Sequence, residues 1–216
     1  METVLSENDR RHLENRIAEA EKLTKSQIVL ATVNRSDSYL EIPWKAFALG
    51  ASITALLVFL IDVILFRWSQ GTAVLLSIAI TLAVAASLVV LTILFPGVAR
   101  IFLSDSRAET ETRQYAESLF LSKELFSTAG RKGILLLISR FERKVVILPD
   151  RGLDGHVNKK DLDGIIELMK RPLAKHQFRE ALEIALDELI RIIEPLTEVE
   201  SVRDELPNTI IEEKGL

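Results

Sequence analysis

Carboxylate side chains are the residues of this sequence best suited to hold a metal ion. Asp150 and Asp154 lie in a glycine-containing loop, Pro149 to Gly155. Two more acids, Asp161 and Asp163, follow it. Carboxylate oxygens are the hard ligands that Ca²⁺ and Mg²⁺ prefer. We therefore predict Asp150 and Asp154 as candidate ligands of Ca²⁺ or Mg²⁺. The alternative is a plain turn before an acid-rich helix start, because acids favour helix N-termini.

The sequence lacks the residue patterns of most other catalytic sites. It contains no cysteine, which excludes thiolate zinc sites and a cysteine nucleophile. His12, His156 and His176 are scattered singly and show no zinc-ligand spacing. Neither a GxSxG motif, a P-loop nor a GxGxxG motif is present in the sequence. The net charge of −4 also argues against a general nucleic-acid binder.

One acid, Asp62, lies inside a long apolar stretch, where the only other charge between Ala46 and Ala99 is Arg67. Acids within a membrane are costly and often functional. If the stretch folds back on itself, Asp62 stands level with Ser77, which can donate a hydrogen bond to it. We interpret Asp62 and Ser77 as membrane-embedded polar residues with a structural role. The alternatives are a contact of Asp62 with Arg67 near the membrane surface, and ion or proton handling in an oligomer.

Two apolar runs form that stretch, Trp44 to Trp68 and Gly71 to Phe95. Each is long enough to cross a hydrocarbon core about 30 Å thick, which needs about 20 residues of helix. The turn between them is so short that only a helical hairpin satisfies the backbone in lipid. We predict a transmembrane hairpin over residues 44–95. A buried hairpin of a soluble protein is the alternative, although soluble core helices of this length usually carry a polar face.

Basic residues flank the chain ends of the predicted hairpin. Those before the first run are Lys25, Arg35 and Lys45, and those after the second are Arg100, Arg107 and Arg113. Only Arg67 lies near the turn. By the positive-inside rule, we expect both termini in the cytoplasm. The segment before Lys25 holds no apolar run of a signal peptide, so the hairpin is the first translocation signal.

The rest of the sequence alternates between helix and strand patterns. The predicted elements are a helix over 6–25, a strand over 27–33, the hairpin, a helix over 105–128, strands over 134–138 and 144–148, and helices over 159–171 and 177–193. In the helix over 105–128, the predicted buried stripe is Tyr115, Leu119, Phe120 and Phe126. The first two strands and the helix between them form a β-α-β crossover with the hairpin in its loop. We predict one α/β domain in two parts, 1–40 and 105–195, followed by a flexible acidic tail over 196–216.

This order of elements places one turn near the start of the hairpin. The first strand ends at the bilayer, the next helix runs away from it, and the second strand returns toward it. The turn that follows contains Arg140, Phe141, Arg143 and Lys144. We predict that these residues contact anionic headgroups, each cation contributing about 1 kcal/mol. A solvated hairpin tip is the alternative.

The run GILLLISRFERKVVILPDRGLDG, Gly133 to Gly155, resembles the signature of the TPM domain family. The closest match lies in the Arg143-Lys144 pair and in the Gly-Leu-Asp motif of Gly152 to Asp154. The resemblance covers nearly all of the chain outside the hairpin and the tail. It implies an α/β sandwich, divalent-cation binding in some members and an acid-phosphatase activity proposed for some, many of them tethered to bacterial membranes. Two loops, Phe126 to Gly130 and Asp150 to Gly152, depart from the family pattern where ligands are expected.

We therefore predict a multi-pass protein of the bacterial inner membrane with a TPM-like α/β domain in the cytoplasm. The predicted function is non-catalytic. The domain is an interaction module that binds other membrane proteins in their assembly or maintenance, with a homo-oligomer as one arrangement. The alternative function is an acid phosphatase linked to a divalent cation. A small channel or transporter is a third class, which requires an oligomer with Asp62 lining a pore.

Overall fold

The computed structural model of the chain describes residues 5–65, 71–154, 157–194, 210–213 and 215. The chain divides into two compact units. We call residues 38–108 the hairpin unit, and residues 1–37 together with 109–216 the sheet unit. The sheet unit is thus built from two parts of the sequence that are separated by the whole hairpin unit.

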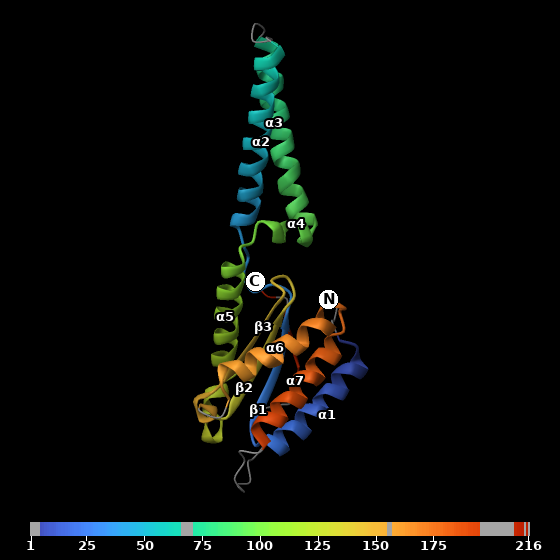
Figure 1. Cartoon of the computed structure of the whole chain (residues 1–216), viewed down its shortest axis with the longest axis vertical. Coiled ribbons are helices and arrows are strands. Elements are labelled where there is room, and N and C mark those ends of the chain that lie inside the picture. Colours follow the sequence, from blue (N-terminus) through green and yellow to red (C-terminus); the bar gives the residue numbers. More distant parts are fainter. Residues whose placement is uncertain (1–4, 66–70, 155–156, 195–209, 214, 216) are drawn as a thin grey trace. The chain divides into compact units, whose positions relative to one another are not determined.

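A four-stranded sheet in the order β3-β2-β1-β4 lies within the sheet unit (Figure 1). β1 (Gln27–Val33) pairs in parallel with β2 (Gly133–Ser139), and β3 (Lys144–Pro149) pairs antiparallel with β2. β4 (Ile211–Glu213) lies on the other side of β1 and runs parallel to it. Every residue of β1 and β2 is buried, as expected for apolar central strands. The three strands predicted from the sequence and their pairing directions are confirmed.

Helices cover both faces of this sheet (Figure 1). Side chains of β1 alternate between the two faces. Ile28 and Leu30 lie in one core with α1 (Glu7–Thr24), α6 (Lys159–Ala174) and α7 (Phe178–Ile193). Val29 and Ala31 lie in a second core with α5 (Asp105–Ser122). The fold is therefore a mixed α/β fold, and α5 forms the predicted crossover between β1 and β2.

The predicted helix over 105–128 was too long. α5 ends at Ser122, and two short 3-10 helices follow, η1 (Leu125–Ser127) and η2 (Ala129–Arg131). Glu124 has a left-handed backbone with φ of 53°, which breaks the helical path before η1. Phe126 is 37% exposed, so its place in the buried stripe was wrong.

Two further boundaries differ from the prediction. The break expected at Pro172 comes later, because α6 continues to Ala174. A proline in the last turn of a helix removes one hydrogen bond near an end that is already frayed. β4 was not predicted at all, since it lies within the segment assigned to a flexible tail.

The hairpin unit contains two long helices, α2 (Glu41–Leu65) and α3 (Gly71–Leu94), which pack side by side (Figure 1). Their 25 and 24 residues correspond to about 37 and 36 Å of helix at 1.5 Å per residue. α2 begins three residues before the predicted Trp44. A short helix, α4 (Pro96–Ile101), follows Phe95. Trp68, the end of the first predicted apolar run, and most of the turn lie outside the described residues.

Candidate functional site

The carboxylate of Asp150, predicted as a metal ligand, is engaged by an arginine. Nε and Nη2 of Arg131 donate to its two oxygens at 2.8 and 2.9 Å, and the Arg151 amide donates to one of them at 2.8 Å. Asp150 is 5% exposed. Burial alone would raise the pKa of Asp150, but the hydrogen bonds from Arg131 and from the Arg151 amide outweigh it and lower the pKa. A divalent cation that bound this carboxylate would have to displace the Arg131 guanidinium.

Backbone packing holds the same two loops together. η3 (Arg151–Leu153) follows Asp150 and lies against η2. A Cβ atom at Gly152 would lie 2.0 Å from the carbonyl oxygen of Gly130, a distance that no side chain tolerates. Gly152, the first residue of the Gly-Leu-Asp motif, therefore has a packing role. Arg131 could not be recognised from sequence as the partner of Asp150, because the two residues are distant in the chain.

The remaining acids of this region lie apart from Asp150. Asp154 and Asp163 are exposed, and Asp161 forms a capping box with Asn158 at the start of α6. The part of the chain that the structure describes contains no group of three His, Cys, Asp or Glu that could hold a metal ion. His156 lies outside the described residues. The binding of Ca²⁺ or Mg²⁺ at Asp150 and Asp154 stays a prediction.

In the hairpin unit, α2 turns one narrow stripe of residues toward α3. The stripe repeats every four residues and consists of Ile42, Ala46, Gly50, Thr54, Val58 and Asp62, all buried or half-buried. The residues of α3 with the same burial include Ser77, Thr81, Ala85, Leu88 and Thr92. Asp62 and Ser77 are both half-buried. Contact between their side chains stays a prediction.

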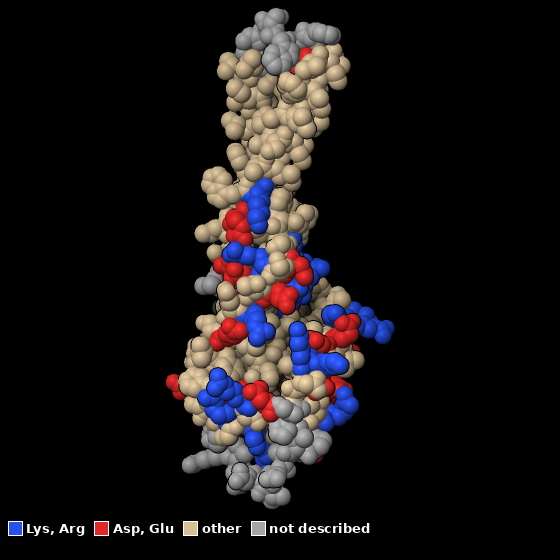
Figure 2. Space-filling model, turned by 60° about the vertical axis from the view of Figure 1, so that its left-hand side comes forward, with Lys and Arg blue, Asp and Glu red and all other residues tan. Residues whose placement is uncertain are grey.

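Large apolar side chains lie on the outside of both helices. Of the 28 exposed large hydrophobic residues in the described structure, 21 belong to α2 and α3. Leu57 is 53% exposed and Ile64 is 71% exposed. Most of the surface of these helices carries no charged side chain (Figure 2). Both helices are long and apolar enough to cross a membrane, by length and composition alone.

The predicted headgroup-contact turn lies beside the carboxyl end of β1. The Arg140 amide donates to the Val33 carbonyl at 3.0 Å, and the Phe141 amide donates to the Asn34 carbonyl at 2.9 Å. Nη1 of Arg140 also donates to Oδ1 of Asn34 at 2.7 Å. Phe141 is 5% exposed and lies under Arg35, whose guanidinium carbon is 4.2 Å from the ring centroid. The ring is therefore inside the domain, and Phe141 is not a surface contact.

A buried carboxylate, Glu142, fixes the same turn. It accepts hydrogen bonds from the Ser36 amide at 2.8 Å and from the Ser139 hydroxyl. The Ser36 hydroxyl is 3.1 Å from the Ser139 hydroxyl. These three polar side chains join the end of β2 to the chain that leaves β1 for the hairpin unit. They were not predicted, because a serine and a glutamate 106 positions apart form no recognisable motif.

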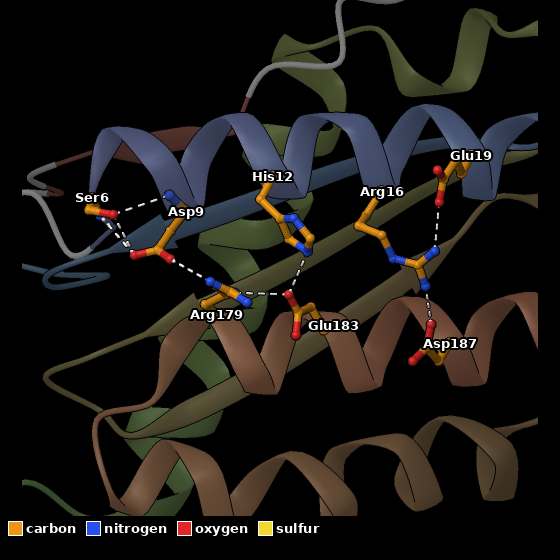
Figure 3. Close-up of polar contacts among 8 residues, drawn as sticks. All are labelled: Ser6, Asp9, His12, Arg16, Glu19, Arg179, Glu183 and Asp187. Carbon is orange, nitrogen blue, oxygen red and sulfur yellow. Dashed lines mark hydrogen bonds and ion pairs between the residues drawn. The ribbon is translucent and has the colours of Figure 1, made fainter.

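A row of ion pairs joins α1 to α7 (Figure 3). Asp9 pairs with Arg179 at 3.2 Å, His12 lies 2.9 Å from Glu183, and Arg16 pairs with Asp187. The Ser6 hydroxyl donates to Asp9, and the Arg16 guanidinium also donates to Glu19. Hydrogen bonds from Ser6 and then from Arg179 lower the pKa of Asp9. The partners are spaced three to four residues apart on both helices, so this row fastens α1 along α7 and gives His12 a structural role.

Comparisons with known proteins agree with this fold. Residues 98–192 match the family model of the TPM domain. No curated protein matches the sequence. Among solved structures, the chain is similar to the NMR structure of BA42 protein from the psychrophilic bacteria Bizionia argentinensis sp. nov.. That match has a TM-score of 0.59 and 14% sequence identity, and covers 98% of this chain and 97% of that chain.

The sheet with helices on both faces places the protein among mixed α/β proteins. The matched segment starts in α4 and ends in α7, so it contains α5, β2, β3 and the loops around Asp150. The segment of residues 98–192 belongs to the TPM domain family. At 14% identity, the similarity to BA42 protein concerns the fold alone.

Proposed function

We propose that this protein is an integral membrane protein in which α2 and α3 cross the bilayer and tether the TPM domain to its surface. One observation carries the proposal, namely the polarity of the hairpin unit. The residues buried or half-buried between the helices are mostly small or polar, whereas most of its large apolar residues are exposed. In water this arrangement exposes apolar area at a cost of about 25 cal/mol per Å². In lipid the same surface is favourable, and close packing of small residues stabilises the helix pair.

The proposed membrane is the bacterial inner membrane, with both termini in the cytoplasm, as the distribution of Lys and Arg favours. Single cysteines test this orientation without background, because the chain contains none. In cells or inverted vesicles, a membrane-impermeant maleimide should label Ser69→Cys from the periplasmic side and Ser104→Cys from the cytoplasmic side. Labelling of both positions from one side would contradict the hairpin.

We propose further that the TPM domain binds other membrane proteins in their assembly or maintenance. Acids of the loops that a phosphatase would use already serve the fold, since Asp150 pairs with Arg131 and the Asp161 carboxylate accepts a hydrogen bond from the Asn158 amide at the start of α6. The protein crosslinked in its native membranes should yield defined membrane-protein partners. Hydrolysis of p-nitrophenyl phosphate that depends on Ca²⁺ or Mg²⁺ and is lost in Asp150→Asn would instead support the phosphatase.

A contact of the turn Arg140 to Lys144 with anionic headgroups is part of this proposal, without Phe141. The turn is hydrogen-bonded to Val33 and Asn34, and six residues separate Asn34 from the first residue of α2. Arg143 of this turn is exposed, as a contact with headgroups requires. A spin label at Arg143→Cys should be accessible to a lipid-soluble relaxation agent, and one at Asp154→Cys should not. Equal accessibility would exclude the contact.

A further inference from the structure

The edge of β1 carries a short strand whose side chains alternate between the two helical layers. Ile210, just before β4, is 1% exposed and lies in the core with α1, α6 and α7. Ile211 packs on the opposite side, in the core with α5. Glu212 and Glu213 repeat the alternation, because Glu212 faces Arg10 of α1 and Glu213 faces Tyr115 of α5. The edge thus receives one apolar and one acidic side chain on each face of the sheet.

Both acids meet donors that belong to the helices. Nη2 of Arg10 lies 3.2 Å from Oε1 of Glu212, and the two side chains are 25% and 14% exposed. The Tyr115 hydroxyl donates a hydrogen bond to Oε2 of Glu213. Burial, and then the hydrogen bond and charge of Glu213, raise the pKa of Tyr115. The tyrosine therefore stays a donor throughout the physiological pH range, and the two faces of the edge each offer one donor for a carboxylate.

The backbone beside the end of β1 requires a glycine two residues after β4. The Asn34 amide donates to the Glu213 carbonyl at 3.2 Å. Two residues later, Gly215 has a left-handed backbone with φ of 76°. A Cβ atom at Gly215 would lie 1.7 Å from the Arg35 carbonyl oxygen. This fit indicates a built binding edge rather than a loose contact of the chain end.

The fit of β4 is nevertheless incomplete. β4 pairs only with Ala31, Thr32 and Val33, whereas the Ile28 amide further back along β1 donates to the Glu21 carboxylate at 2.8 Å. Within the described residues, Nε of Arg10 and Oγ1 of Thr32 are buried without a hydrogen-bond partner. Thr32 lies directly opposite Glu212 in the pairing register, so one unmet group adjoins β4. Buried groups without partners cost free energy, so this part of the edge is not fully satisfied by β4.

We infer that the β1 edge is a docking site for an extended segment of a partner protein, added parallel to β1, with two apolar residues followed by two acids. β4, together with Ile210 before it, has the sequence Ile-Ile-Glu-Glu, and is the chain's own occupant that competes with the partner. Addition of a strand to a sheet edge is a common mode of peptide binding. This inference rests on the proposed interaction module, and it names the surface and the chemistry of its partner.

Fluorescence anisotropy with the full-length protein in detergent tests the inference. The probe is a labelled peptide of residues 208–216, NTIIEEKGL. The variant Ile211→Pro is used to free the β1 edge from β4, since proline cannot donate a hydrogen bond to the sheet at that position. We expect the probe to bind Ile211→Pro at least tenfold more tightly than the unaltered protein. A probe with lysine in place of the first glutamate should bind at least tenfold more weakly. The double variant Arg10→Glu, Ile211→Pro should prefer that altered probe.

Equal binding to both proteins, or equal binding of the two probes, would overturn the inference. If Ile211→Pro does not fold, hydrogen exchange of the unaltered protein decides. The Thr32 and Asn34 amides, which face β4, should exchange at least tenfold faster than the Leu136 amide in the centre of β2. Equal protection would show that β4 does not leave the edge. A dimer that Ile211→Pro abolishes would instead assign the edge to a second copy of the chain.

These outcomes are independent of membrane insertion. Labelling of Ser69→Cys reports the hairpin, and the peptide probe reports only the edge of β1. Failure of the probe with correct labelling would leave a tethered domain without this docking edge. Failure of labelling with a binding probe would leave the edge on a protein that is not inserted as proposed.

Discussion

The two units of this protein bury opposite kinds of side chain. In the sheet unit, Leu13, Leu136 and Leu182 are fully buried. In the hairpin unit the fully buried residues include Ala46 and Ala85, while most leucines and isoleucines are exposed. Both units are rich in the same aliphatic residues, so amino-acid type alone does not decide burial. The position of these residues around each helix does, since helices of the sheet unit turn their apolar face inward, whereas the hairpin helices carry most of their large apolar residues on the outside.

The largest expected effect comes from charges on the outside of the hairpin unit. The double variant Leu57→Arg, Leu82→Arg places two cations on exposed positions of α2 and α3. Each arginine near the middle of a membrane helix costs about 2.5–3.5 kcal/mol, so we expect loss from the membrane fraction after carbonate extraction. The control is Leu121→Arg, an exposed leucine of α5, which should stay in the membrane. Retention of the double variant would contradict the contrast between the units.

The next effect concerns the core of the sheet unit. Leu136→Ala removes a fully buried side chain from β2 and should lower the free energy of unfolding by about 2–5 kcal/mol. Urea titration in detergent, followed by hydrogen exchange of β2, measures this change. The matched control is Leu57→Ala in the hairpin unit, which should leave the β2 exchange unchanged. A similar loss in both variants would mean that the units do not fold independently.

Substitution of two helical glycines by alanine should change stability in opposite directions. A Cβ atom at Gly50 would lie 3.1 Å from Cα of Ala85 and 2.7 Å from a methyl carbon of Leu88, whereas one at Gly164 of α6 meets nothing within 4 Å. We expect Gly164→Ala to stabilise the sheet unit by about 0.8–1 kcal/mol through helix propensity. Gly50→Ala should instead lower the midpoint of hairpin unfolding, measured by the fluorescence of Trp44. Stabilisation by both substitutions would show that α2 and α3 are not in close contact.

The smallest effect is a dependence on pH that belongs to the sheet unit. The pKa values of Asp9 and Asp150 are lowered from 3.8, so each carboxylate binds protons less readily in the folded than in the unfolded domain. Their stabilisation is present above pH 3.8 and is lost as the pH falls through the lowered values. Urea midpoints between about pH 5 and pH 2 should therefore fall less steeply in Asp9→Asn, Asp150→Asn. An unchanged slope would assign the acid sensitivity to other groups.

Sequence patterns predicted the strands better than the site. β1 and β2 could be identified because a continuous apolar run such as Ile134 to Ile138 is typical of a strand covered on both faces. The start of α1 was clear from Ser6, which forms a capping box with Asp9. Each of these signals depends on residues that are close together in the sequence, and the structure contains the strand or helix start that each one predicts.

The features that were not predicted depend on distant partners. From the sequence alone, Asp150 resembles a metal ligand, but in the structure it pairs with Arg131. Glu142 resembles an ordinary turn residue, but in the structure it accepts a hydrogen bond from the Ser36 amide. β4 has only three residues, and the β-branched Ile210 and Ile211 were its one signal. Whether a short segment pairs along a sheet edge depends on the backbone groups of the neighbouring strand and on the side chains around it. These groups are distant in the chain, so a single sequence does not reveal them.

The insertion of the hairpin unit between β1 and α5 also sets the order of events during synthesis. Gln27 emerges from the ribosome long before its partner Gly133, and the whole hairpin unit is made in between. At about 5–20 residues per second, that interval lasts about 5–20 s. During this time β1 has no β2 to pair with, while α2 and α3 are already complete. The proposed membrane helices can therefore engage the insertion machinery first, and the sheet closes only after β2 has been made.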